Sequence, residues 1–282
     1  MRRYLPAVLL VGCLSCGGPP ANTTQTVSSS TATDFEKLTD DLLYGSLALA
    51  PVSATQVGYH EHNGVQLDEE LDDFGAAGID AQRAFWDGLK TRIDALGAAS
   101  LDKEQQADLD IMKNQINLAL LELTTIQSYK HNPTVYVELA GNALFTPYML
   151  NYAPKERRFQ QITKRLEQFP ALFEQAKANL TDAPEVWNRV AREENDGTIG
   201  LIDKTLRAEV PEAQKVDYGR AAEGAVAALK TTRDELDALA KPKTAKQALD
   251  DVAKQHATPE TYMAEAKKAL VQATASDRKS VV

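Results

Sequence analysis

Cysteine is almost absent from this sequence. The 282 residues contain two cysteines, Cys13 and Cys16, and both lie within the first sixteen positions. The rest of the chain therefore cannot form an internal disulfide or a thiolate metal site, and it offers no cysteine nucleophile.

Aromatic residues and clustered basic residues are also scarce. Aromatics make up 6% of the chain, whereas alanine and leucine are frequent, a composition that favours helices over sheets. The 31 basic residues face 40 acidic ones, for a net charge of −9, and they form no basic stripe. Because binding to nucleic-acid phosphates requires clustered positive charge, we predict no nucleic-acid partner.

Familiar catalytic signatures are missing as well. The sequence contains no His-Glu-x-x-His motif, no Gly-x-Ser-x-Gly motif, no phosphate-binding loop and no dinucleotide fingerprint. His60 and His62 could share a metal on an extended segment, but zinc needs at least three protein ligands, and the only other imidazoles are His131 and His256. We therefore predict no metal site and no cofactor in this chain, and its catalytic residues, if any, stay unknown.

The first sixteen residues have the features of a bacterial lipoprotein signal peptide. Arg2 and Arg3 precede the apolar run 4–12, which is too short to span a bilayer. The segment Leu10–Cys13 resembles a lipobox, which predicts lipidation of Cys13, with Cys16 as the alternative. We expect export and lipid anchoring in the cell envelope, on the periplasmic face of the outer membrane, so the membrane is one predicted partner.

Residues 17–33 form a predicted disordered tether rich in Ser and Thr, because they contain too few apolar residues to offset the entropy of ordering. Residues 34–282 form the predicted folded body. Apolar residues recur there at helical spacing and no long period-two alternation occurs, so the predicted fold is all-α, an array of antiparallel helices.

The helices of this body are bounded by capping residues, glycines and prolines. A capping box at Thr33–Glu36 predicts a first helix up to Pro51, followed by a loop, and Asp102 is predicted to cap a long helix that ends before Pro133. Residues 133–153 are predicted to be loop with one short helix, and Pro170 to kink or divide the helix after Pro154. The other predicted helices span residues 80–96, 182–206 (interrupted by Gly197 and Gly200), 213–240, 245–256 and 259–274.

Two groups of polar residues are candidates for a functional site. The first is a possible cleft lined by a histidine-rich segment and by tyrosines of the central irregular region: His60, Glu61, His62, Tyr148 and Tyr152. The alternative is that these residues have no functional role: the histidines would lie in an exposed polar loop and the tyrosines would be partly buried in a helical core. The second group is Arg192, Glu193, Glu194 and Asp196, where paired carboxylates suit acid–base chemistry but a charged helix face is the simpler interpretation.

Two longer stretches carry a family resemblance. The first contains Pro51, Ala54, Thr55, Gly58 and His60, followed by Asn63 and Asp68, and the second contains Arg165, Leu166, Pro170, Leu172, Ala176, Asn179, Leu180 and Pro184. In this order, over residues 34–275, they resemble the N-terminal half of the bacterial family known as domain of unknown function 885. The first stretch departs from the family pattern at Asn63, where aspartate is common, and at Leu67, which stands one place late.

This resemblance implies a relationship to helical zinc-dependent peptidases about twice as long, whose metal motif lies in their C-terminal half. The present sequence ends at residues 276–282 without that motif. We therefore expect a shortened envelope lipoprotein without catalysis of its own. The alternatives are a helical scaffold that binds a peptide or protein partner, and a metal-dependent hydrolase whose zinc comes with a separate C-terminal half.

Overall fold

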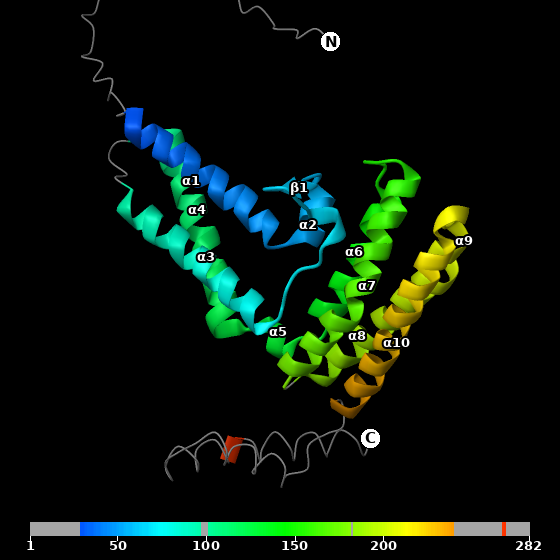
Figure 1. Cartoon of the computed structure of the whole chain (residues 1–282). Coiled ribbons are helices and arrows are strands. Elements are labelled where there is room, and N and C mark those ends of the chain that lie inside the picture. The colour runs from blue at the N-terminus through cyan, green and yellow to red at the C-terminus, as the bar shows by residue number, and fades with distance from the viewer. Residues whose placement is uncertain (1–28, 97–100, 182, 240–266, 269–282) are drawn as a thin grey trace, which may run out of the picture.

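The computed structural model describes residues 29–96, 101–181, 183–239 and 267–268. It confirms the predicted all-α class, with helices arranged in two groups that diverge in Figure 1. The first group consists of α1 (Ser29–Ala48), α3 (Ala76–Ala95) and α4 (Lys103–Leu121), and the second of α6 (Thr134–Met149), α7 (Lys155–Asn179), α8 (Glu185–Gly200) and α10 (Lys215–Leu239). None of the helices in these ranges is long and apolar enough to cross a bilayer.

Short elements join the two groups. Between α1 and α3 lie α2 (Pro51–Val57), a two-stranded antiparallel hairpin of β1 (Glu61–His62) and β2 (Val65–Gln66), and the 3-10 turn η1 (Leu67–Glu69). The other connecting elements are two π-helical turns, η3 (Glu122–Ile126) and η4 (Leu201–Leu206), together with α5 (Ser128–His131), α9 (Arg207–Glu209) and η5 (Glu212–Gln214).

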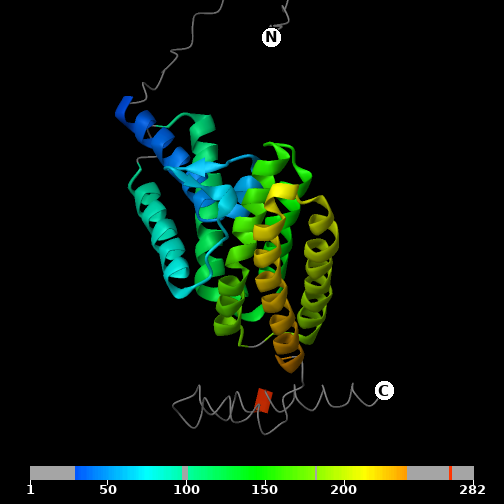
Figure 2. The ribbon, with the colours of Figure 1, turned by 45° about the vertical axis from the view of Figure 1, so that its right-hand side comes forward.

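Helices α6, α7, α8 and α10 of the second group run side by side in Figures 1 and 2, and α7 is one of its two longest helices. It packs against α6 on one side and α10 on the other, and α8 contacts both of these neighbours. Its apolar positions step by three and four residues and are buried as the spacing predicts: Phe159, Ile162, Leu166, Phe169, Phe173 and Ala176. They belong to one hydrophobic cluster that continues into α1, α3 and α4.

Several predicted helix boundaries are confirmed and others are wrong. Asp102 and Gln105 form the predicted capping box at the start of α4, and α7 begins after Pro154 as predicted. Pro170 does not divide α7, which continues to Asn179. However, α1 begins at Ser29, inside the predicted tether and ahead of the predicted cap at Thr33. No glycine or proline between 29 and 33 stops the helix there.

Two segments are more helical than predicted. Pro51 begins α2, in a segment predicted as a loop, because a proline at the first helical position loses no hydrogen bond. Residues 134–149 form the four-turn helix α6, where only one short helix was predicted. Burial of Tyr136 and Val137 outweighs their weak helix propensity.

The remaining predictions for the body have mixed outcomes. Helix α8 passes through Gly197 without interruption and continues as the π-helical turn η4. The hairpin at residues 61–66 was not predicted, although Asn63-Gly64 is a strong signal for a two-residue turn, and both residues have positive φ, 49° and 82°. The predictions for residues 1–28, 245–256 and most of 259–274 fall outside the described residues.

Candidate functional site around His60 and Asp68

The side chain of Asp68 lies at the centre of a buried polar cluster. Its Oδ1 accepts hydrogen bonds from the Thr55 hydroxyl at 2.8 Å and from His60 Nδ1 at 3.0 Å, and its Oδ2 accepts one from Gln161 Nε2 at 3.0 Å. Asp68 is 2% exposed, so these donors replace the water that a carboxylate needs. The cluster joins α2, η1 and α7.

The carboxylate determines the orientation of the His60 ring. An ionised carboxylate can only accept hydrogen bonds, so the contact with Asp68 assigns a proton to His60 Nδ1. The His60 side chain is 34% exposed, whereas that of Asp68 is 3% exposed. Because Nδ1 contacts Asp68, Nε2 is the ring nitrogen left to contact a group outside the cluster.

Tyr152 forms the second wall of the site. Its ring stacks on His60 with centroids 4.4 Å apart, and its hydroxyl donates to Gln161 Oε1 at 2.9 Å. Burial, and then the charge of Asp68, raise the pKa of Tyr152, so the hydroxyl stays protonated and keeps donating. Arg158 holds this segment in place by donating to the carbonyls of Pro147 and Tyr148 at the end of α6.

Arg165 holds the elements behind the site together. It is fully buried, and its guanidinium donates to Thr55 Oγ1 at 2.7 Å and to the carbonyls of Pro51, Leu67, Glu70 and Ala143. Thr55 Oγ1 accepts from Arg165 and directs its own proton toward Asp68 Oδ1 at 2.8 Å and the Pro51 carbonyl at 3.1 Å. Desolvation lowers the pKa of Arg165, but an arginine remains charged in proteins.

Two of the five residues predicted for the cleft come together, namely His60 and Tyr152. Glu61 instead accepts from Gln66 across the hairpin, and His62 contacts Tyr59 through Nδ1 and Asn63 through Nε2. The ring of Tyr148 packs against the hydrophobic core. Because His60 Nδ1 contacts Asp68 and His62 Nδ1 contacts Tyr59, the two histidines do not act as a pair here.

Sequence reasoning did not select Thr55, Asp68, Gln161 and Arg165 as site residues. The signal that could have found them is the helical spacing of the polar residues Arg158, Gln161 and Arg165 on α7, next to its apolar stripe. Buried polar side chains at that spacing need partners, and the acceptors are supplied by the segment 51–70.

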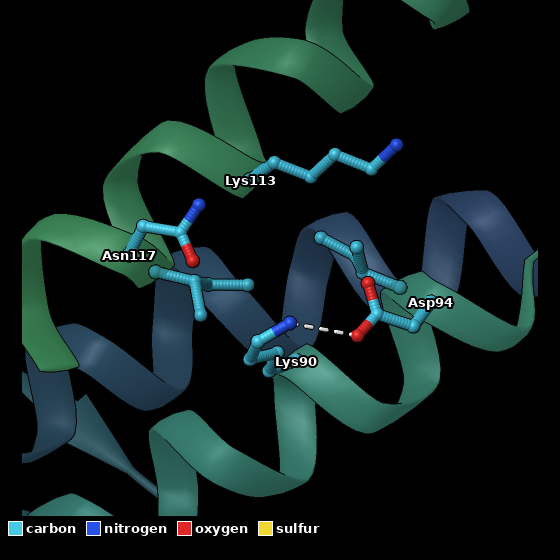
Figure 3. A pocket seen from close by; sticks show the side chains of 6 residues that line it. Lys90, Asp94, Lys113 and Asn117 are labelled. Carbon is cyan, nitrogen blue, oxygen red and sulfur yellow. Dashed lines mark hydrogen bonds and ion pairs between the residues drawn. The ribbon is translucent and has the colours of Figure 1, made fainter.

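A small pocket between α3 and α4 is a weaker candidate (Figure 3). Its volume is about 80 Å³, and Lys90 at its mouth is already paired with Asp94 at 2.8 Å. A space of that size holds a few water molecules at about 30 Å³ each. Within the described ranges, no group of three or more His, Cys, Asp or Glu side chains is placed to hold a metal ion.

Comparison with known proteins agrees with this geometry. The sequence profile of a family described as bacterial protein of unknown function, DUF885, matches residues 51–277. The chain belongs to this family. Its match includes both motif stretches, and residues of the two stretches meet in the structure, where Arg165 of the second donates to Thr55 of the first.

A solved structure has a similar fold. It is that of a candidate lipoprotein of unknown function from Shewanella oneidensis, with a TM-score of 0.66 and 19% sequence identity. The similarity covers 81% of the present chain but 46% of the other, so this DUF885 chain spans less than half of its structural neighbour. No curated protein matches the sequence.

Proposed function

We propose that this DUF885 protein is an exported, lipid-anchored envelope protein whose helical body binds a peptide or protein partner and does not catalyse a reaction by itself. The observation that carries the proposal is how the polar residues of the two motifs are used. Thr55, Asp68 and Arg165 form hydrogen bonds with one another or with the backbone. These residues hold α2, η1 and α6 on α7, so their role is to shape a surface.

His60 is the group of this cluster that reaches the surface. An imidazole with a fixed tautomer beside an aromatic ring can accept a hydrogen bond from a backbone or side-chain N–H and cover an apolar group. The two hydroxyls of the site, those of Thr55 and Tyr152, already donate hydrogen bonds to Asp68 and Gln161. A recognition role therefore fits this surface better than hydrolysis.

The absence of catalysis can be tested with the purified chain. We expect no cleavage of a mixed-sequence peptide library, with or without added zinc, and no change on addition of a chelator. Cleavage that a chelator abolishes would show that the chain is a complete metalloenzyme and would refute the proposal.

Anchoring is tested separately. With labelled fatty acid, the wild-type protein should take up label and sediment with membranes, whereas Cys13→Ser should do neither. Cys16→Ser is the matched control and should behave as wild type. Labelling that is lost only in Cys16→Ser would place the lipid on the alternative cysteine, and labelling of neither would refute anchoring.

A second candidate function is favoured by the length of the structural neighbour. This chain corresponds to 46% of that protein, so a separate polypeptide could complete the fold and bring a zinc site, with His60 facing the joint cleft. Sequencing the DNA downstream of the codon for residue 282 in all three frames tests this. The candidate requires a downstream reading frame for a helical half with a histidine-rich metal motif, and a His60→Ala variant that lowers the activity of the mixed halves.

A further inference from the structure

The helices α6 and α8 enclose an open groove that the His60 site does not use. Its volume is about 310 Å³, and its lining residues are Val137, Glu138, Gly141, Asn142 and Phe145 from α6, with Glu194, Gly197, Thr198 and Leu201 from α8 and η4. Two of these residues, Gly141 and Gly197, contribute no side chain to the lining. A cavity of this size accommodates one or two long side chains of a partner.

Two carboxylates in this groove have no cation. Glu138 and Glu194 form no ion pair within the described part of the chain, and the Oε2 atom of Glu194 is buried without a hydrogen-bond partner. Burial, and then the charge of Glu138, raise the pKa of Glu194. A positively charged group between the two carboxylates would offset their mutual repulsion and would donate a hydrogen bond to the unsatisfied Oε2 atom of Glu194.

Apolar side chains extend the groove on both sides of this acidic pair. On α6, Phe145 and Met149 follow Glu138 at intervals of seven and four residues, and they are 49% and 54% exposed. On α8, Trp187 precedes Glu194 by seven residues and is 40% exposed. These spacings keep the side chains on one face of each helix. The row from Glu138 to Met149 is about 16 Å long, which equals about three turns of a bound helix.

We propose that this α6–α8 groove binds an amphipathic helix of a partner protein, with a lysine or arginine of its apolar face placed between Glu138 and Glu194. The charge complementarity defines the basic residue, and the apolar rows on either side define the amphipathic helix around it. This inference rests on the proposed binding function and identifies both the surface and the chemistry of its partner. A polyamine would satisfy the carboxylates alone and would leave the apolar rows uncovered.

The probe is a synthetic 18-residue amphipathic helix of near-zero net charge, with leucines on one face and a single lysine among them. Near-zero charge matters because the protein itself carries a net charge of −9. A set of peptides moves the lysine along the leucine face, and a second set has glutamine in its place. Binding is followed by calorimetry and by the emission of Trp187, in a Trp86→Phe background.

We expect the affinity to depend both on the lysine of the peptide and on the two carboxylates of the groove. For at least one lysine position, the wild type should bind the lysine peptide tenfold or more tightly than its glutamine twin. The variant Glu138→Gln/Glu194→Gln should bind both peptides equally and no tighter than the wild type binds the glutamine peptide. The matched control Asp108→Asn/Glu223→Gln removes two exposed charges elsewhere and should behave as wild type.

The apolar rows are tested in the same way. Phe145→Ser should weaken binding of the lysine and glutamine peptides by the same factor, about fivefold or more. Ile111→Ser, which alters a side chain 67% exposed on α4, should change nothing. The glutamine substitutions remove a repulsion, so circular dichroism should show a melting temperature at least as high as that of the wild type.

Three outcomes would overturn the inference: no binding at any lysine position, an equal loss of affinity in the matched charge control, or spermine that binds at Glu138 and Glu194 independently of Phe145. None of them refutes the broader binding function. That function instead fails if the purified chain hydrolyses peptides in a chelator-sensitive way, so the two failures are distinguishable.

Discussion

Arg165 has the largest fully buried side chain in the described part of the protein. It is a charged residue whose hydrogen bonds go to four backbone carbonyls and to the Thr55 hydroxyl. Asp68 and Asp72 lie near enough to favour its charge. The planar guanidinium of arginine has five N–H donors and can therefore bond to all of these acceptors, whereas a lysine would leave some of them unsatisfied.

Asp72 is the second acid beside this guanidinium, and burial raises its pKa to about 6. Its Oδ1 accepts a hydrogen bond from the backbone N–H of Val52 at the start of α2, at 3.1 Å. The folded state therefore prefers the protonated acid more than the unfolded chain does, and this contribution to stability is present at low pH. It is lost as the pH rises through the folded pKa.

We predict that the wild type loses stability relative to Asp72→Asn between pH 4 and pH 7, by up to about 2 kcal/mol. Asparagine keeps the acceptor for Val52 but cannot ionise. Urea unfolding of both proteins at four pH values in this range measures the difference. A difference that does not vary with pH would show that Asp72 titrates at its ordinary pKa.

At the scale of elements, the sequence predicted α3, α7, α10 and the start of α4 well because each has a long apolar stripe or a clear cap. Asp102 illustrates the reason, since a local hydrogen bond to Gln105 fixes where α4 begins. The predicted end of α4 just before Pro133 is wrong, since the helix ends at Leu121 and the π-helical turn η3 follows. Helix α6 was predicted as a short helix and is longer, because its stability comes from burial between α7 and α8, which local propensity does not reveal. The hairpin was missed although Asn63-Gly64 encodes it.

The difference between local signals and tertiary packing also explains which parts of the candidate site were predicted. His60 and Tyr152 were predicted because the side chains of histidine and tyrosine commonly line functional sites. Asp68 and Gln161 are 93 residues apart, and their contact depends on how η1 packs against α7. Pairing across that distance is a property of the tertiary fold, and the spacing of the polar residues on α7 indicates only that Gln161 needs a partner, without identifying it.

Replacing either of two glycines by alanine should change the free energy of unfolding, in opposite directions. Gly58 ends α2 with a φ of +83°, in the left-handed region, whereas Gly224 lies inside α10 and a Cβ added to it would meet nothing within 4 Å. Gly58→Ala should lower the free energy of unfolding by about 1 kcal/mol. Gly224→Ala should raise it by about 0.5–1 kcal/mol because alanine favours the helix.

Urea unfolding monitored by circular dichroism measures both changes, and each variant serves as the control for the other. Equal losses in the two variants would mean that a generic effect of the added methyl group, rather than backbone conformation, determines the outcome.

At the scale of the whole molecule, the two helical groups meet through the short elements of the segment 50–75. Arg165 of α7 bonds to carbonyls of this segment, and Asn179 near the other end of α7 donates to the carbonyl of Phe74 at 2.8 Å. The segment thus lies along α7 and is held by polar contacts, while one hydrophobic cluster runs through both groups. The polar contacts couple the groups in addition to the shared core.

The two tryptophans of the chain report on the two groups separately. Trp86 lies on α3 of the first group and Trp187 on α8 of the second. We predict that wild-type unfolding in urea is a single transition, so that the single-tryptophan variants Trp86→Phe and Trp187→Phe each show coincident fluorescence and circular dichroism midpoints.

Arg165→Met should break this coincidence. It leaves buried carbonyls without donors and should lower the overall free energy of unfolding by about 3–5 kcal/mol. Because it removes the bonds that hold the segment 50–75 on α7, the Trp86 group should unfold at a lower urea concentration than the Trp187 group. Arg189→Met, which alters an exposed arginine of α8, should leave one transition with an unchanged midpoint. If Arg165→Met still unfolds in one step with both tryptophans, the shared apolar core alone couples the two groups.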